Sequence, residues 1–196
     1  MNIFRDEQDY FNFLKRMKIV LGQADSATKA TLAGPMQGLP LLKLQALPTD
    51  SFSLISYCLM PNHFHFLIRQ NTEIPLSKLM LKVSTSYSMY FNKKYDHVGG
   101  VFQDCFKAVL AESNEQLLWL SAYIHQNPKV AGLVKGLKNW QWSNYLDYID
   151  ARKGDMCDID VILGQFKNIS EYADFVDSSF SLIKERKDLE ELFLDE

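Results

Sequence analysis

The sequence predicts an α+β fold in which helices pack on a mostly antiparallel sheet. Two runs rich in aromatic and branched residues, SFSLISYC and HFHFLIRQ, have the composition of strands and are separated only by LMPN. Three other stretches carry apolar residues at helical spacing. With 196 residues, 47% of them hydrophobic, the chain is long enough to bury a sizeable core in one domain with an appendage.

The first expected element is an amphipathic helix over residues 6–21, where apolar side chains such as Tyr10 and Phe13 recur at helical spacing. Gly22 is expected to end it. From 22 to 50 the composition turns to Gly, Pro, Ala, Ser and Thr around LPLLKL. We therefore expect a long connection before the first strand.

An antiparallel hairpin is expected next, because Pro61 and Asn62 favour a turn between the strand-like runs 51–58 and 63–70. The hairpin has two faces, because successive side chains of a strand point to opposite sides of the sheet.

Helical spacing returns over 76–90, with Pro75 suited to the start of the helix. The basic stretch NKKYDHVGG that follows is expected to be an exposed loop, and VFQDCFKAVLA, residues 101–111, a further strand. A last helix begins after Ser113, a good N-cap residue, and Pro128 is expected to stop it.

Charge is divided unevenly along the chain, although the net charge is only −3. Residues 1–146 hold 15 Lys and Arg against 10 Asp and Glu, a net charge of +5. Residues 147–196 hold 6 against 14, a net charge of −8. The basic part is compatible with a nucleic-acid partner, and the acidic tail is most simply a solvated surface.

Cysteine usage and hydropathy point to the cytoplasm. Cys58, Cys105 and Cys157 are far apart and odd in number, so free thiols are the simplest interpretation. No apolar run approaches the ~20 residues that span a bilayer, and the start MNIFRDEQDY lacks the apolar segment of a secretory signal. We therefore expect a cytoplasmic protein without a membrane partner.

Two histidines in the second strand are candidate metal ligands. His63 and His65 stand two apart, so a strand directs both imidazoles to one face while Phe64 and Phe66 point to the other. An isolated pair of this kind is more often an ordinary surface pair than a metal site, so the pattern needs further ligands to be convincing.

A tyrosine and an asparagine in the last helix form a second pattern. Tyr123 and Asn127 stand four apart and share a helix face, whereas His125 lies about 200° round from Tyr123. Alone, the pattern favours a core tyrosine and a capping asparagine. Together with the two histidines, it supplies a nucleophile, two imidazoles and an amide, which suit metal-assisted attack on a phosphodiester.

Four segments carry a family resemblance: YCLMPNHFHFLI, PLSKLMLKVSTSYSMYFNKKY, GGVFQDCFKAVLAE and YIHQNPKVAGLVKGLKNWQWSNY. They closely resemble the single-tyrosine, His-hydrophobic-His (HUH) transposases, especially the branch of REP-associated tyrosine transposases. The likeness covers most of 52–150 in consistent order. It divides the chain into a transposase-like nuclease domain over 1–150, which includes the 22–50 connection, and an acidic helical appendage over 151–196.

The resemblance implies a ferredoxin-like sheet and a divalent ion, Mg²⁺ or Mn²⁺, held by His63, His65 and Asn127. It also implies that Tyr123 attacks single-stranded or hairpin DNA. The products would be a 5′-phosphotyrosine link and a free 3′ hydroxyl, and the reverse reaction would rejoin strands without ATP. Because relatives act as monomers or as dimers, a homodimer is one of the two states expected.

Binding of a single strand would draw on phosphate contacts from lysines and on stacking by aromatic rings. The candidate lysines are Lys78, Lys82, Lys93, Lys94, Lys107 and Lys129, and the candidate rings are those of Tyr90 and Trp142. Taken alone, each lysine is more commonly a solvated surface charge.

Three features depart from the family pattern. Relatives usually begin with an extra strand carrying a histidine and an Arg-Gly pair, which this chain lacks, so the sheet would miss an inner strand unless LPLLKL or a second subunit replaces it. Cys105 stands where relatives commonly carry an arginine that can bind phosphate. The connection 22–50 is also longer than in compact relatives. None of these departures touches Tyr123 or the proposed ligands.

Three alternatives remain beside the active enzyme. The first is a truncated homologue that binds hairpin DNA or RNA without cleaving it. The second is a metal-dependent phosphodiesterase in which water attacks and Tyr123 only positions the substrate. The third is a structural protein, which predicts no affinity for metal and no effect of His63→Ala beyond stability.

Overall fold

The structure is a computed structural model that describes residues 1–24, 44–103 and 105–186. Its helices and its one sheet confirm the predicted α+β class. The chain divides into two compact units, which are described separately. The first unit comprises Met1–Ser53, Pro61–His63 and Arg69–Val109, and the second comprises Leu54–Met60, Phe64–Ile68 and Leu110–Glu196.

The predicted hairpin is confirmed. Strands β1 (Phe52–Met60) and β2 (His63–Gln70) form a two-stranded sheet, joined by Pro61 and Asn62 alone. So short a connection makes the pair antiparallel, as predicted. Most of β1 is buried, whereas β2 is mostly half-buried.

The second edge of β1 is occupied by segments from the C-terminal half of the chain. The backbone N–H of Leu59 donates to Trp142 O at 2.9 Å, and that of Asp158 donates to Leu54 O at 2.8 Å. Isolated bridges join Leu54 to Cys157 and Cys58 to Ser143. The acidic part of the sequence therefore contributes directly to the second unit.

Helix α1 (Glu7–Val20) confirms the first predicted helix within one residue at each end. Asp6 and Asp9 form a capping box at its N-terminus, and Leu21 caps its C-terminus. Gly22 follows with φ at 78°, a left-handed conformation that glycine adopts without strain. The chain thus leaves the helix where the sequence predicted.

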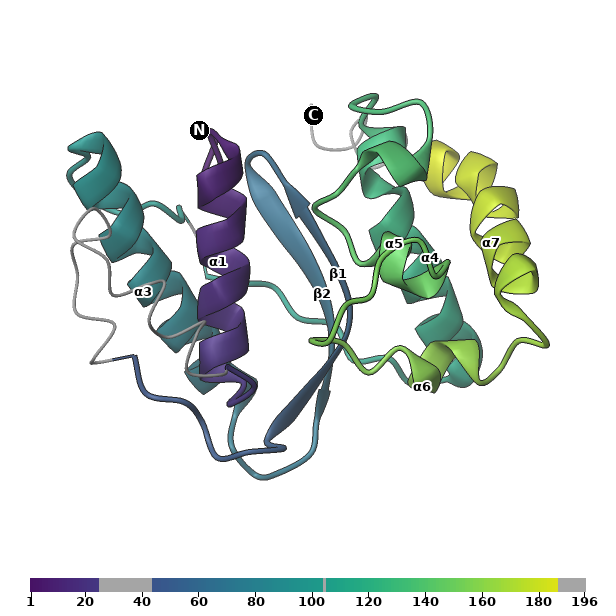
Figure 1. The fold of residues 1–196 in the computed structure, drawn as a ribbon, viewed down its shortest axis with the longest axis horizontal. Coiled ribbons are helices and arrows are strands. Elements are labelled where there is room, and N and C mark those ends of the chain that lie inside the picture. Colours follow the sequence, from purple (N-terminus) through teal and green to yellow (C-terminus); the bar gives the residue numbers. More distant parts are fainter. Residues whose placement is uncertain (25–43, 104, 187–196) are drawn as a thin grey trace. The chain divides into compact units, whose positions relative to one another are not determined.

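Helix α3 (Leu76–Tyr95) packs beside α1 in the first unit, as Figure 1 shows. Phe13 and Tyr87 meet edge to face in their interface, with ring centroids 5.1 Å apart. Arg16 is fully buried there, where its Nε donates to Ser86 O at 3.1 Å and its guanidinium lies 5.0 Å from the centre of the Tyr90 ring. These contacts make α1 and α3 one packed layer.

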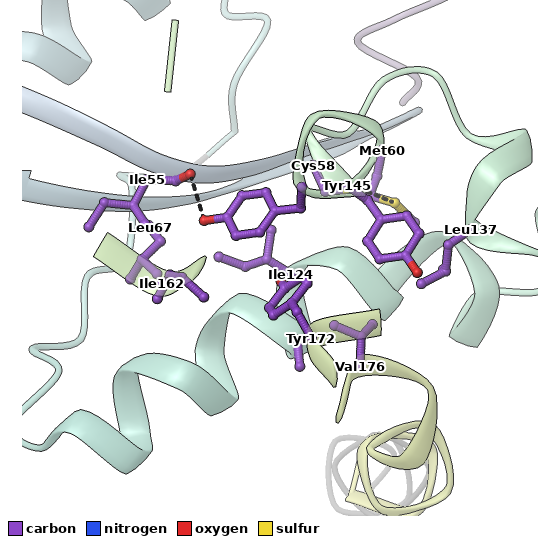
Figure 2. Close-up of a cluster of buried hydrophobic side chains, with 12 residues drawn as sticks. Ile55, Cys58, Met60, Leu67, Ile124, Leu137, Tyr145, Ile162, Tyr172 and Val176 are labelled. Carbon is purple, nitrogen blue, oxygen red and sulfur yellow. Dashed lines mark hydrogen bonds between the residues drawn. The ribbon is translucent and has the colours of Figure 1, made fainter. Parts of the chain in front are cut away.

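The second unit is built around α4 (Asn114–Val130). The shorter elements around it are η2 (Leu137–Asn139), α5 (Tyr145–Tyr148), α6 (Asp160–Leu163) and α7 (Ile169–Ser178). Figure 2 shows their shared core, in which Ile124 of α4 lies among Ile55, Ile162 and Tyr172. The C-terminal helical region predicted from the sequence therefore supplies part of this core.

Asn144 connects three parts of the second unit. Its Oδ1 accepts from the backbone N–H of Tyr57 at 2.7 Å and bonds His125 Nε2 at 3.0 Å, while its Nδ2 donates to Ile55 O at 2.9 Å. His125 Nδ1 lies 2.8 Å from the hydroxyl of Tyr172 in α7. This network ties β1, α4 and α7 together through buried polar groups.

The structure corrects three expectations about individual elements. The described residues of 101–111 form no strand, because side chains such as Val109 and Leu110, which are 80% and 78% exposed, bury no face against a neighbouring strand. Helix α3 continues through Tyr95, so the first four residues of the expected loop NKKYDHVGG are helical.

Pro128 does not stop α4, which runs on to Val130. A proline fits a helical backbone, because its fixed φ is close to the helical value, and the N–H groups that follow it still find acceptors. The N–H of Ala131 donates to Asn127 O at 2.9 Å, and that of Leu133 donates to Pro128 O at 2.9 Å.

Other expectations concern membranes, cysteines and the long connection. Among the residues described, no helix has the length and apolar character needed to cross a bilayer. The three cysteines carry free thiols, as expected. Of the 22–50 connection, residues 25–43, which include most of LPLLKL, lie outside the described residues.

Candidate active site

The two candidate metal ligands lie in β2. His63 opens the strand and His65 follows two residues later, so strand alternation directs both imidazoles to the same face. Both side chains are half-buried. His63 Nδ1 lies 2.7 Å from Oδ1 of Asn62 in the turn, so His63 can be oriented by its neighbour through one ring nitrogen.

The candidate nucleophile lies against this strand within the second unit. The rings of His65 and Tyr123 meet edge to face at 86°, with their centroids 5.7 Å apart. Tyr123 is half-buried, and Ala122 and Ile124 beside it belong to the core. The two sequence patterns, one in a strand and one in a helix, are therefore brought together at His65 and Tyr123.

Asn127 lies one helical turn beyond Tyr123 and is only 2% exposed. Its Nδ2 donates to the backbone oxygen of Tyr123 at 2.8 Å, which fixes the orientation of the amide. Within the described part of the chain, its Oδ1 accepts no hydrogen bond and is not among the fully buried unpartnered atoms. That oxygen can therefore accept a hydrogen bond or bind a cation.

His125 is separate from this site, as its helical position predicted. It is fully buried, with both ring nitrogens hydrogen-bonded to Tyr172 and Asn144. Burial lowers its pKa to about 4, although the hydrogen bond to Asn144 opposes this effect. His125 is thus a neutral residue of the core at neutral pH.

The available donors define the kind of ion that the site could hold. The described residues include no group of three or more His, Cys, Asp or Glu side chains suited to a metal. An ion at His65 would therefore take further protein ligands from other residue types, such as the amide oxygen of Asn127. An imidazole and an amide oxygen form a mixed nitrogen and oxygen set, which suits Mg²⁺ or Mn²⁺ better than a soft thiolate site would.

The six candidate DNA-binding lysines differ in their surroundings. Lys78, Lys93 and Lys107 are exposed, which suits contact with phosphates. Lys82 Nζ donates to Gln45 O, Lys94 forms ion pairs with Asp6 and Asp9, and Lys129 lies 4.4 Å from the centre of the Phe180 ring.

The prediction that Tyr90 and Trp142 stack on bases is wrong, because both side chains are buried. Tyr90 is 4% exposed and donates its hydroxyl to Asp9 Oδ1, and Trp142 is 7% exposed. The sequence reasoning missed Trp119, whose ring stacks on that of Tyr123 with centroids 5.3 Å apart. Its position four residues before Tyr123, on the same helix face, was the signal that could have identified it.

Part of the chain matches a known protein family. Residues 43–127 match the family model described as "Transposase IS200 like". This segment is therefore similar to the IS200-like transposases. The IS200-like segment spans the hairpin, α3 and most of α4, and it contains His63, His65, Tyr123 and Asn127. A search of the curated proteins and a search of the solved structures found no significant match.

An IS200-like transposase segment indicates an enzyme that acts on DNA. The recognition of the single-tyrosine HUH family from sequence motifs is thereby confirmed. The assignment to the REP-associated branch stays a prediction, because the matching model describes the wider family.

Proposed function

We propose that this IS200-like protein is a metal-dependent transposase that cleaves and rejoins single-stranded DNA, with Tyr123 as its nucleophile. His63, His65 and Asn127 would hold the ion, Mg²⁺ or Mn²⁺. Cleavage would leave a 5′-phosphotyrosine intermediate and a free 3′ hydroxyl.

The observation that carries this proposal is the contact between His65 and Tyr123. A phenol is a weak nucleophile, since a tyrosine has a reference pKa of ~10 and is mostly neutral at pH 7. A tyrosine used in catalysis therefore needs a partner that makes the phosphorus more electrophilic. The neighbouring imidazole of His65 offers a place to bind such a partner directly beside the phenol ring.

The donor set supports the choice of ion. The geometry of β2 directs both histidines to one face, and Asn127 has an amide oxygen that accepts no other hydrogen bond in the described residues. When bound, a divalent ion supplies Lewis-acid polarisation of the scissile phosphate and stabilises the leaving oxygen. Asn127 would be positioned for this role by its bond to the backbone of Tyr123.

The reaction balances without ATP. The Tyr123 Oη would attack phosphorus, a new P–O bond would form to the tyrosine, and the bond between phosphorus and the 3′ oxygen would break. The phenol loses one proton and the departing 3′ oxygen gains one. Because the phosphodiester is exchanged for a phosphotyrosine ester, a 3′ hydroxyl can reverse the attack and join two strands.

Strand joining distinguishes this proposal from hydrolysis by water. The chain is incubated with Mn²⁺, a hairpin-containing single strand and a second strand that ends in a 3′ hydroxyl. We expect a joined product from the unchanged protein and none from Tyr123→Phe. Tyr145→Phe is a matched control, because the Tyr145 hydroxyl has no hydrogen-bond partner in the described part of the chain. Hydrolysed strands with no joined product, from both proteins, would contradict the proposal.

A further inference from the structure

Four side chains of the second unit contact one another in a row that includes the proposed nucleophile: Arg186, Trp119, Tyr123 and His65. The guanidinium carbon of Arg186 lies 5.1 Å from the centre of the Trp119 ring. Trp119 stacks on Tyr123 with an angle of 22° between the ring planes, and Tyr123 meets His65 edge to face. Arg186 belongs to helical residues 180–186 of the acidic C-terminal part, so two distant segments meet at this row.

The stability of the fold does not account for a tryptophan at position 119. Its indole Nε1 is buried and has no hydrogen-bond partner among the described residues. A buried donor without an acceptor destabilises the folded state, and leucine or phenylalanine would fill the same place without this cost. A residue that breaks a rule of packing beside a proposed nucleophile is a candidate for a functional role.

The indole of Trp119 and the guanidinium of Arg186 are suited to the two parts of a nucleotide, its base and its phosphate. An indole ring is a good platform for a nucleobase, because every base has a flat π face. A guanidinium is also planar, stacks on aromatic rings and binds phosphate through paired N–H groups. Arg186 therefore occupies ring area that a base would otherwise cover, and its exposed side chain is accessible to a strand bound at Trp119.

We propose that Trp119 is the stacking platform for the base next to the phosphodiester attacked by Tyr123, and that Arg186 supplies the cation for the adjoining phosphate. This inference rests on the proposed function, because it takes Tyr123 as the point of attack. It adds a base contact that is tolerant of sequence, one helical turn from the nucleophile.

The test compares the binding of oligo(dT) with that of an abasic strand of equal length, which has the same phosphates and no bases. Both are bound to the full chain carrying Tyr123→Phe, so that no covalent step contributes. The ratio of the two dissociation constants measures the contribution of the bases.

Trp119→Leu is expected to reduce the preference for oligo(dT) roughly 5- to 100-fold, which is the effect of losing one stacked base. Trp119→Phe keeps a ring and is expected to retain most of the preference. Phe11→Leu, which alters an exposed ring of α1, serves as the control without effect. An unchanged preference in a folded Trp119→Leu variant would overturn the proposal, and so would equal losses in the Leu and Phe variants, which would indicate packing alone.

Arg186→Gln tests the second half of the proposal. It is expected to weaken the binding of the abasic strand, and to reduce the slope of log affinity against log salt concentration for both strands by about 0.7, the value for one phosphate contact on a single strand. An unchanged slope would overturn the phosphate role of Arg186.

Adduct formation by the unchanged protein separates this inference from the proposed function. A covalent adduct together with an unchanged base preference in Trp119→Leu would overturn the platform and leave the nucleophile intact. Loss of the preference without any adduct would support the platform and contradict the nucleophile.

Discussion

The imidazole of His65 meets the ring of Tyr123 edge to face, with the two centroids 5.7 Å apart. This contact joins a strand motif to a helix motif that lies 58 positions later in the chain. Neither motif is specific alone, because paired histidines in strands and tyrosines in helices are common in proteins of many functions. Their contact lies within the segment that matches the IS200-like transposases.

Metal binding should depend on His65. We expect His65→Ala to lose most of the Mn²⁺ affinity of the chain in a calorimetric titration, because one of two imidazole ligands is removed. Asn127→Ala should weaken binding less, by about 10- to 100-fold, if its amide oxygen is a ligand or orients one. His97→Ala is the matched control, because the His97 side chain bonds Asn92 in the first unit. Equal Mn²⁺ affinity in all four proteins would contradict the site.

Stability should fall in mild acid because of His125. Burial lowers its pKa to about 4, whereas an unfolded histidine has a pKa of ~6.5. Between these two values the unfolded chain takes up a proton at this position and the folded chain does not. The contribution of His125 is therefore fully present above pH ~6.5 and is lost as the pH falls toward ~4, by about 3 kcal/mol in total.

Urea unfolding at a series of pH values measures this effect. The free energy of unfolding of His125→Gln, which cannot titrate, should vary less over the same range than that of the unchanged protein. The difference between the two curves isolates His125 from the other three histidines. Parallel curves from pH 7 to 4 would show that His125 is not held neutral in the folded state.

Lys94 should matter for stability, in contrast to its exposed neighbour Lys93. Lys94 Nζ lies 2.7 Å from Asp6 Oδ1 and 2.8 Å from Asp9 Oδ1, and the Asp9 side chain is fully buried. Burial alone would raise the pKa of Asp9, but hydrogen bonds led by that from Lys94 lower it below its ordinary value.

Lys94→Met removes the principal cationic partner of a buried carboxylate, so we expect a loss of about 2 to 3 kcal/mol in the free energy of unfolding. Lys93→Met should change it by less than about 0.5 kcal/mol. Chemical denaturation of the two variants provides the comparison. If both variants weakened DNA binding while leaving stability unchanged, Lys94 would be a binding residue with no role in the fold.

The elements with a strong local pattern were predictable. Helix α1 has regular apolar spacing, a capping box at Asp6 and a glycine at its end, and its bounds agree with the sequence within one residue. The hairpin was equally clear, because the turn at Pro61 and Asn62 lies between two strand-like runs. Where neighbours in space decide the structure, local patterns failed. Residues 101–111 have the composition of a strand, but those of them that the structure describes form no strand. Pro128 is tolerated in the last turn of α4.

The site was predictable in part for the same reason. Alternation in β2 and the helical repeat of α4 assign faces, so spacing paired His63 with His65 and Tyr123 with Asn127. The expected roles of these residues came from the family resemblance. The sequence could not show which rings are exposed, and it therefore selected Tyr90 and Trp142, which are buried. Arg186 was not predictable, because its contact with Trp119 joins the acidic tail to a helix 67 positions earlier.

The central claim is that Tyr123 becomes covalently joined to DNA. The direct measurement uses hairpin-containing single strands labelled at the 3′ end, because a 5′-phosphotyrosine link retains the 3′ fragment. After incubation with Mn²⁺, we expect label to comigrate with the unchanged protein on a denaturing gel, and peptide mass analysis to locate it on Tyr123. An adduct that persists in Tyr123→Phe, or free cleaved fragments with no adduct on any strand that binds, would contradict the account.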